Sequence, residues 1–212
     1  MTVPSEVAPR QVGRRRSVAA DTAILEATVE LLREVGYDRL TVSAVIDRAG
    51  VSSATLYRRW TTKPDLVVAA VSGLVPAVAD VDQGSLADDL EVFVAGVARS
   101  ISTRDETVAD ALTAAARRDP NLAEALEARF VRPRAAALDA ILTRAVARGE
   151  LLERPSVEVA TSLVLGPVYH RGLYLRLSLT PAFVHAATAH VLRGLGASGP
   201  GPAPRRRSRG SA

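Results

Sequence analysis

Residues 40–66 read LTVSAVIDRAGVSSATLYRRWTTKPDL, and this stretch predicts two short helices separated by a glycine turn. Thr41 can cap the first helix, because its side-chain oxygen can accept a hydrogen bond from a backbone N–H of the first turn. Gly50 can adopt a left-handed backbone conformation that a side chain would resist, and Ser52 can cap the second helix. This spacing is typical of a helix-turn-helix, whose second helix lies in the major groove of DNA.

Helical periodicity extends to both sides of this stretch. From Ser17 to Gly36, apolar residues recur at three- and four-residue steps, and Gly36 is a stop signal for that helix. Thr62 can cap a further helix, in which Pro64 lacks only an N–H that the first turn leaves unused. Residues 17–75 are therefore predicted to form a three-helix DNA-binding domain that contains the helix-turn-helix.

The rest of the chain is also predicted to be helical, with longer segments rich in Ala and Leu. No stretch alternates apolar and polar residues in the way that strands do, so the expected fold class is all-α. Pro133 implies a kink or a break in the longest helix. We expect residues 76–195 to form a helical effector-binding and dimerisation domain, with helices near residues 85–102, 105–118, 121–148, 156–177 and 180–195.

The positive charge of the chain is concentrated at its two ends. Residues 1–20 hold four Arg and one Glu, and residues 196–212 hold four Arg and no acidic residue. Because the whole chain has a formal net charge of +4, residues 21–195 are net negative. Both ends are rich in Pro, Gly, Ser and Arg, so residues 1–16 are predicted to be a disordered basic arm and residues 196–212 a disordered tail. Specific DNA recognition must then come from the folded residues.

Composition excludes several classes of site. The chain has no Cys and three His, so a disulfide, a thiolate nucleophile and a Cys-ligated zinc are excluded, and we expect neither cofactor nor metal. The longest uncharged apolar stretch, residues 66–79, is too short for a transmembrane helix and contains Gly73 and Pro76. Acidic residues follow the N-terminal arginines closely, which argues against a signal peptide. We expect a soluble, cytoplasmic protein with no membrane partner.

Residues 23–71 contain a set of motifs around the predicted turn: Gly36-Tyr37, Thr41, the run AGVS at residues 49–52, the run TLY at residues 55–57, an aromatic residue at Trp60, and Lys63. With these motifs, the segment resembles the N-terminal DNA-binding domain of the TetR family of bacterial transcriptional regulators. Two residues depart from the family pattern: Ile46, where a small residue is usual, and Trp60, where Phe is more common. Ile46 predicts locally different packing between the two helices of the motif, and neither residue removes a DNA-facing group.

This resemblance implies a transcriptional regulator, most often a repressor, that binds a palindromic double-stranded DNA operator as a homodimer. A small-molecule effector would release it from the operator. Beyond the helix-turn-helix the resemblance is diffuse and rests mainly on residues 144–151, RAVARGEL, and on the apolar last two helices.

The resemblance also implies DNA-binding roles for individual residues. Tyr57 and Lys63 match positions whose hydroxyl and ammonium contact phosphates, which sets register rather than sequence. Small side chains occupy the positions that touch bases, so direct base readout is expected to be modest. Each residue also has a structural explanation, since Tyr57 could be half-buried core and Lys63 an ordinary solvated helix start. The expected DNA-binding residues are Thr41, Ser43, Ser52, Ser53, Ala54, Thr55, Tyr57, Arg58, Arg59 and Lys63.

Arg14, Arg15 and Arg16 stand just before the first helix, and two roles are open for them. They could form an arm that reaches phosphates or the narrow minor groove, as N-terminal arms do in other helix-turn-helix proteins. They could equally belong to a solubilising tail.

The last two predicted helices carry apolar faces that no later element could cover. This pattern indicates an isologous homodimer, although burial of both helices within one subunit is the alternative. The expected interface residues are Leu163, Val164, Val168, Leu175, Phe183, Ala187, Val191 and Leu192.

Polar or aromatic groups on otherwise apolar stretches are weak markers of an effector pocket, and packing is the commoner role of each. Because aromatic residues make up only 4% of the chain, the pocket is expected to be mostly aliphatic and the effector apolar. The candidate pocket residues are Phe93, Phe130, Arg134, Tyr169, His170 and Tyr174.

Two other functions are left open. The chain has no Gly-x-Ser-x-Gly elbow, no phosphate-binding glycine loop, no His-Glu-x-x-His pair and no dinucleotide fingerprint. His170 has no evident carboxylate partner, so an enzyme would have to act through an unrecognised site. The other alternative is a helical interaction protein without specific DNA binding.

Overall fold

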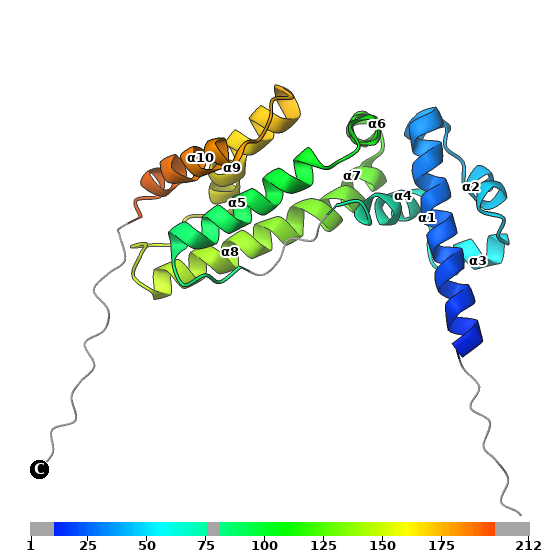
Figure 1. The fold of residues 1–212 in the computed structure, drawn as a ribbon, viewed down its shortest axis with the longest axis horizontal. Helices are drawn as coiled ribbons and strands as arrows, with labels where there is room; N and C mark the ends of the chain where they lie inside the picture. The colour runs from blue at the N-terminus through cyan, green and yellow to red at the C-terminus, as the bar shows by residue number, and fades with distance from the viewer. Residues whose placement is uncertain (1–10, 76–80, 198–212) are drawn as a thin grey trace, which may run out of the picture. The chain divides into compact units, whose positions relative to one another are not determined.

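The computed structural model describes the backbone of residues 11–75 and 81–197, and the side chains within these ranges from residue 18 onward. Every regular element in these ranges is helical, which confirms the expected all-α class (Figure 1). The chain forms two compact units. Within the described residues, unit 1 contains residues 11–75 and 105–129, and unit 2 contains residues 81–104 and 130–197.

Unit 1 begins with the elements of the helix-turn-helix region. These are α1 (Gln11–Arg39), α2 (Val42–Ala49), α3 (Ser53–Tyr57) and α4 (Lys63–Ser72). The predicted caps are confirmed: the hydroxyl oxygens of Thr41, Ser52 and Thr62 accept hydrogen bonds from backbone N–H groups at 3.2, 3.3 and 3.1 Å. Gly50 ends α2 with φ 64° and ψ 34°, in the left-handed region that its position in the turn requires.

The N-terminal boundary of the first helix differs from the prediction. We expected disorder through residue 16, but the backbone is helical from Gln11, because Gln and Arg are good helix formers and extend α1 by further turns. The side chains of Arg14, Arg15 and Arg16, the first ten residues and the tail from residue 198 onward lie outside the described part of the structure.

The other end of α1 is interrupted at Gly36, as the sequence predicted. Gly36 has φ 72° and ψ 176°, a backbone conformation that is essentially restricted to glycine, and a last helical turn follows it. The amide of Leu40 then donates to the carbonyl oxygens of Gly36 and Tyr37 at 3.2 Å each. This break directs the chain from α1 into the helix-turn-helix.

We expect Gly36→Ala to lower the free energy of unfolding by about 1–3 kcal/mol, because alanine disfavours this backbone conformation. Gly73→Ala is the matched control, since Gly73 has φ −66° and an added Cβ would lie 3.6 Å from the Ala70 carbonyl oxygen, an ordinary contact. Urea unfolding followed by Trp60 fluorescence measures both variants. Equal effects of the two substitutions would contradict the conformational explanation.

Unit 1 also contains α6 (Glu106–Ala116) and α7 (Pro120–Leu126), which corrects the predicted boundary at residue 75. The sequence analysis predicts one continuous second domain over residues 76–195, whereas residues 105–129 belong to unit 1. Instead α6 packs on α1 and α7 packs on α4. The apolar side of α6 buries Val108, Leu112 and Ala115.

Polar contacts hold α6 and α7 to the end of α1. Arg33 Nε lies 2.6 Å from Asp105 Oδ2 at the start of α6, and Arg118 Nη2 lies 2.7 Å from Asp38 Oδ2 at its end. The Arg33 contact also lowers the pKa of Asp105, whose carboxylate caps α6. The helix-turn-helix therefore has a platform that comes from a later part of the sequence.

Unit 2 is built from α5 (Leu86–Ser102), α8 (Arg132–Ala147), α9 (Val157–Tyr169) and α10 (Pro181–Gly194). Helix α5 packs against the other three, so it lies at the centre of the bundle (Figure 1). Phe93 of α5, Ile141 of α8 and Val168 of α9 are almost fully buried in one hydrophobic core. Burial of these side chains is the main favourable term for this unit.

Two π-helical turns interrupt the longer predicted helices. The turn η1 (Glu127–Val131) separates α7 from α8, and Pro133 occupies the first turn of α8, where its missing N–H is not needed. Residues 120–147 are thus helical without a gap, and the departure from α-helical geometry lies in η1, just before Pro133. The turn η2 (His170–Tyr174) ends α9 before residue 177, the predicted end of this helix.

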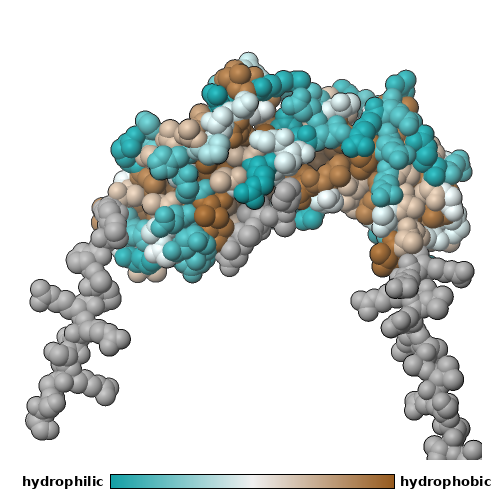
Figure 2. Space-filling model, in the orientation of Figure 1, coloured by the Kyte–Doolittle hydropathy of each residue, from teal (hydrophilic) through white to brown (hydrophobic). Residues whose placement is uncertain are grey.

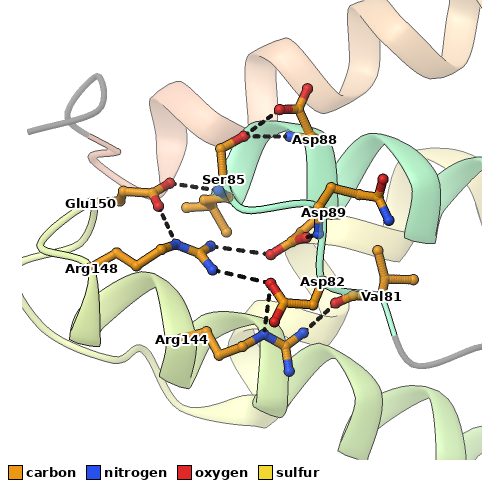
Figure 3. Close-up of polar contacts among 10 residues, drawn as sticks. Val81, Asp82, Ser85, Asp88, Asp89, Arg144, Arg148 and Glu150 are labelled. Carbon is orange, nitrogen blue, oxygen red and sulfur yellow. Dashed lines mark hydrogen bonds and ion pairs between the residues drawn. The ribbon is translucent and has the colours of Figure 1, made fainter. Parts of the chain in front are cut away.

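A network of charged side chains joins the segment before α5 to the end of α8 (Figure 3). Arg148 is at its centre: Nη2 lies 3.1 Å from Asp89 Oδ2, and Nε donates to Glu150 Oε1. The side chain of Asp89 is 0% exposed and that of Glu150 is 9% exposed. Both carboxylates also accept backbone N–H bonds, Asp89 from Gln83 and Glu150 from Leu86. Arg144 lies beside Asp82 at the edge of the same network.

Candidate nucleic-acid interface

Both helices of the helix-turn-helix carry exposed side chains, and most of the residues expected to meet DNA lie on α3 and at its two ends. Ser43 on α2 and Ser53, Ala54 and Arg58 around α3 are exposed, whereas Leu56 faces inward and is 1% exposed. Tyr57 is 52% exposed. About half of the Tyr57 surface is therefore open to solvent, and its phosphate contact stays a prediction.

Thr41 and Ser52 already have structural roles at the interface. Each caps its helix through a side-chain oxygen, and Ser52 Oγ also lies 2.9 Å from Thr55 Oγ1. A serine or threonine hydroxyl can accept from the backbone while still donating outward. These three residues thus hold the N-terminal ends of α2 and α3 in place, and their exposure is compatible with a DNA contact.

Arg59 differs from its neighbour Arg58. Its Nε lies 2.6 Å from Asp21 Oδ1 on α1, and its side chain is only 20% exposed. This contact joins the end of α3 to α1. Arg59 therefore has a structural role in addition to its predicted phosphate contact, while Arg58 is exposed.

Lys63, at the start of α4, rests on an aromatic ring. Its Nζ lies 4.2 Å from the centroid of the Tyr37 ring, a cation–π contact that holds the ammonium near the surface of the unit. Partial burial lowers the pKa of Lys63, and Asp38 and Asp119 oppose this shift. Lys63 is thus not an ordinary solvated helix start.

Tyr37 in turn is held by Asp119, the N-cap residue of α7. Its hydroxyl donates to Asp119 Oδ2 at 2.6 Å, and Asp119 also accepts from the backbone N–H groups of Asn121 and Leu122. Burial, and then the bond to Asp119, raises the pKa of Tyr37, while the same bond lowers the pKa of Asp119. Lys63, Tyr37 and Asp119 form a chain of contacts that connects α4 to α7 through α1.

This chain of contacts predicts a pH dependence. The pKa of Asp119 is lowered in the folded state, so its contribution to stability is present above its ordinary value of 3.8 and is lost as pH falls through the folded value. Tyr37→Phe removes the largest cause of that shift. We therefore expect the substitution to lower the free energy of unfolding more at pH 7 than at about pH 3. Urea unfolding at both pH values tests this, and an equal loss at both would contradict it.

Arg48 fixes α2 against α1 and was not identified from the sequence. It makes a paired contact with Glu34, at 2.8 and 2.9 Å, and a further contact with Glu30 at 3.3 Å. The hydrogen bond from Arg48 lowers the pKa of Glu34. Since Arg48 is engaged with α1, it orients α2 rather than adding an independent positive charge to the interface.

The six candidate effector residues do not form one site. Phe93 is 1% exposed in the core of unit 2, and Phe130 is half-buried. His170 and Tyr174 are exposed and stack on each other, with ring centroids 5.4 Å apart. Arg134 and Tyr169 form a second contacting pair, through a hydrogen bond of 3.3 Å from Arg134 Nη1 to Tyr169 Oη.

A cleft of about 350 Å³ lies in unit 1 instead, between α4 and the α7–η1 segment, and contains none of the six candidates. Arg129 Nε donates to Ser72 Oγ across this cleft at 2.9 Å. Its walls are mostly small and apolar, and its lining residues are Asp65, Val68, Ala69, Ser72, Ala125, Ala128 and Arg129.

The predicted dimer interface divides into two groups. Val164, Val168 and Val191 are at most 4% exposed because they belong to the core of their own subunit, so their assignment to the interface is corrected. The other five residues remain at least partly exposed: Leu163, Leu175, Phe183, Ala187 and Leu192.

Two further observations limit the chemistry of the described residues. They contain no group of three or more His, Cys, Asp or Glu residues arranged to hold a metal ion. No helix among them has the length and hydrophobicity needed to cross a membrane.

Two short capped helices around a left-handed glycine, with exposed polar side chains on the second, define a helix-turn-helix protein of the DNA-binding class. Family comparisons agree: residues 24–70 match the family described as bacterial regulatory proteins, tetR family. Residues 80–191 match the tetracyclin repressor-like C-terminal domain. The chain belongs to the TetR family and is a DNA-binding transcriptional regulator.

Individual relatives are similar over most of the chain. The uncharacterized HTH-type transcriptional regulator YdeS of Bacillus subtilis (strain 168) is 31% identical over 187 residues, 88% of this chain and 94% of that protein. The DNA-binding transcriptional repressor TetR of Mycobacteroides abscessus is 31% identical over 137 residues, 64% of this chain and 72% of that protein. The crystal structure of the TetR family transcription regulator SCO0332 matches with a TM-score of 0.61 and 29% identity, covering 82% of this chain and 97% of that chain.

Proposed function

We propose that the protein is a repressor that binds a palindromic operator as a homodimer and leaves it when a small, largely apolar effector binds. The observation that carries this proposal is the surface of α3 and the start of α4, where Tyr57 and Arg58 are exposed and Lys63 is half-buried beside a capped turn. The Mycobacteroides abscessus relative is named a repressor, which supports repression as the sign of regulation. Because its target is chromosomal DNA, we place the protein in the cytoplasm.

Within this proposal, the side chains of the interface divide by role. Tyr57, Arg58 and Lys63 contact phosphates and set the register on the duplex. Ser43, Ser53 and Ala54 face the base edges; serine can pair with several bases and alanine can only touch a thymine methyl, so direct readout is modest. Sequence-dependent shape of the DNA then supplies a large part of the specificity.

The homodimer is supported by exposed apolar side chains on unit 2. Val159 and Leu163 lie four residues apart on α9, hence on one face, and are 62% and 39% exposed. Figure 2 shows a further hydrophobic patch at the tip of unit 2, where the chain passes from α9 to α10. The exposed residues of this segment are Leu173, Tyr174, Leu175 and Leu177. A second copy with the same face would remove both surfaces from water.

Effector release requires two states of the dimer. The effector must bind more tightly to the state that does not fit DNA, because a ligand with equal affinity for both states does not change their populations. A coupling free energy of roughly 1–3 kcal/mol would weaken DNA binding by about 5- to 150-fold.

A gel-shift titration with DNA from upstream of the protein's own gene tests this function. We expect a shifted complex that a palindromic fragment competes away, and lower affinity for Tyr57→Phe on all DNA sequences, because a phosphate contact is lost. If no palindrome gives a complex, the chain is a helical interaction protein without specific DNA binding. The names of the relatives favour regulation over an enzymatic role.

A further inference from the structure

Arg134 brings a positive charge to the edge of the unit 2 core without a carboxylate beside it. Its Nη2 donates to Ser100 Oγ at 2.8 Å and its Nη1 donates to Tyr169 Oη at 3.3 Å. Ser100 is 5% exposed, and Tyr169 packs against the hydrophobic core. Among the residues that the structure describes, no Asp or Glu forms an ion pair with Arg134.

Arg134 differs from several other arginines of this protein in that its described partners are hydroxyl groups rather than carboxylates. Hydroxyl groups can orient a guanidinium, but they leave its charge unbalanced, and a partly buried charge is costly unless it is paired. Arginines that do contact a carboxylate include Arg33, Arg48, Arg118, Arg148 and Arg154.

The geometry around Arg134 is suited to a ligand with negative charge. Ser100 is on α5, Arg134 is in the first turns of α8, and Tyr169 ends α9, so three helices of one unit fix the guanidinium. A guanidinium has more N–H donors than these two bonds use, in a planar fork that matches a carboxylate. Such charge-assisted, paired hydrogen bonds are among the strongest that proteins make.

We propose that Arg134, oriented by Ser100 and Tyr169, binds a carboxylate of the effector. The effector is then a small organic acid with an apolar body, which packs against the adjoining hydrophobic core. This inference rests on the proposed function, because it names the chemical class of the molecule that releases the DNA. In it, Arg134 contacts the ligand, and Tyr169 is a positioning residue that acts through Arg134.

Matched pairs of acids and neutral amides test this proposal. The probes are octanoate with octanamide and 4-phenylbutyrate with 4-phenylbutanamide, titrated into the full-length chain by calorimetry without DNA. We expect each acid to bind at least about 10-fold more tightly than its amide, as expected for a charge-assisted bond. Arg134→Gln should reduce this preference to below about threefold, and Tyr169→Phe should reduce it partly.

The control variant is Arg99→Gln, which removes an exposed positive charge next to Ser100 on α5 and should leave the preference unchanged. Circular dichroism melting checks that Arg134→Gln folds. If it does not, Arg134→Lys replaces it, since lysine keeps the charge but lacks the planar fork and should lower the preference.

Three outcomes would overturn the inference: amides that bind the wild-type chain as tightly as acids, acids that bind Arg134→Gln unchanged, or no binding by either acid. The gel shift without any ligand separates this inference from the proposed function. If the wild-type chain binds its operator but shows no preference for acids, only the proposal that the effector is an organic acid is overturned. If the chain prefers acids but forms no complex with DNA, only the proposal that it is a repressor is overturned.

Discussion

Arg148→Met should lower the free energy of unfolding of unit 2 by about 3–5 kcal/mol, the largest stability effect that we expect from a single substitution in this protein. The variant leaves Asp89, which is 0% exposed, and Glu150, which is 9% exposed, without their shared cation. Methionine fills a similar volume, so the loss would come from unpaired buried charge rather than from a cavity. The backbone N–H bonds to both carboxylates remain, and they offset only part of this loss of stability.

Arg154→Met is the matched control. Arg154 also contacts a carboxylate, Asp139 at 2.7 Å, but the two side chains are 51% and 38% exposed, so less than about 1 kcal/mol should be lost. Urea unfolding should be followed by circular dichroism, because the single Trp, Trp60, reports on unit 1 only. If both arginine variants lost the same small amount, the network would not be held by buried charge.

Lys63→Ala should weaken operator binding by about 30- to 150-fold at moderate salt. The proposed dimer presents two copies of Lys63, and each lost phosphate contact is expected to contribute about 1–1.5 kcal/mol. Each contact also releases counterions, so the slope of log affinity against log salt should fall by about 2 for the dimer. Fluorescence anisotropy with an operator fragment, over a series of salt concentrations, measures both quantities.

Arg117→Ala controls for the loss of one positive charge, because Arg117 is exposed at the end of α6, outside the helix-turn-helix. It should change the salt slope by much less than Lys63→Ala. A Lys63 variant that altered base preference but kept its affinity for random DNA would disprove the phosphate assignment.

Local signals in the sequence predicted the helix-turn-helix well. The caps at Thr41, Ser52 and Thr62 each involve an N–H three residues away, so the spacing of residues along the chain is enough to identify them. Gly36 and Gly50 mark helix ends because a positive φ favours glycine at those positions. The exposure of Tyr57 and Arg58 followed from the same motif.

Contacts between distant residues could not be predicted in this way. Asp119 lies 82 positions from Tyr37, and Arg48 lies 14 positions from Glu34, so no local pattern joins them. For the same reason the ion pair between Arg59 and Asp21 could not be predicted. Arg134 was singled out as a polar group on an apolar stretch, but its partner Ser100 was not.

The apolar residues of the last helices show a different limit of sequence reasoning. Periodicity identifies an apolar stripe, but it does not say whether the stripe faces its own core or a second subunit. Val164 and Val168 turned out to face the core, whereas Leu163, beside them in the sequence, is 39% exposed. Which neighbour an apolar side chain meets is decided by the packing of whole helices.

The discontinuous composition of unit 1 has a practical consequence for anyone recombining regulators of this family. A hybrid spliced at residue 75 would separate the DNA-reading helices from residues 105–129, and so from the partners of Arg33, Tyr37 and Asp38. Foreign helices at those places would leave these polar groups unmatched. A transplanted operator specificity should therefore include α6 and α7 as well, grafted at three junctions instead of one.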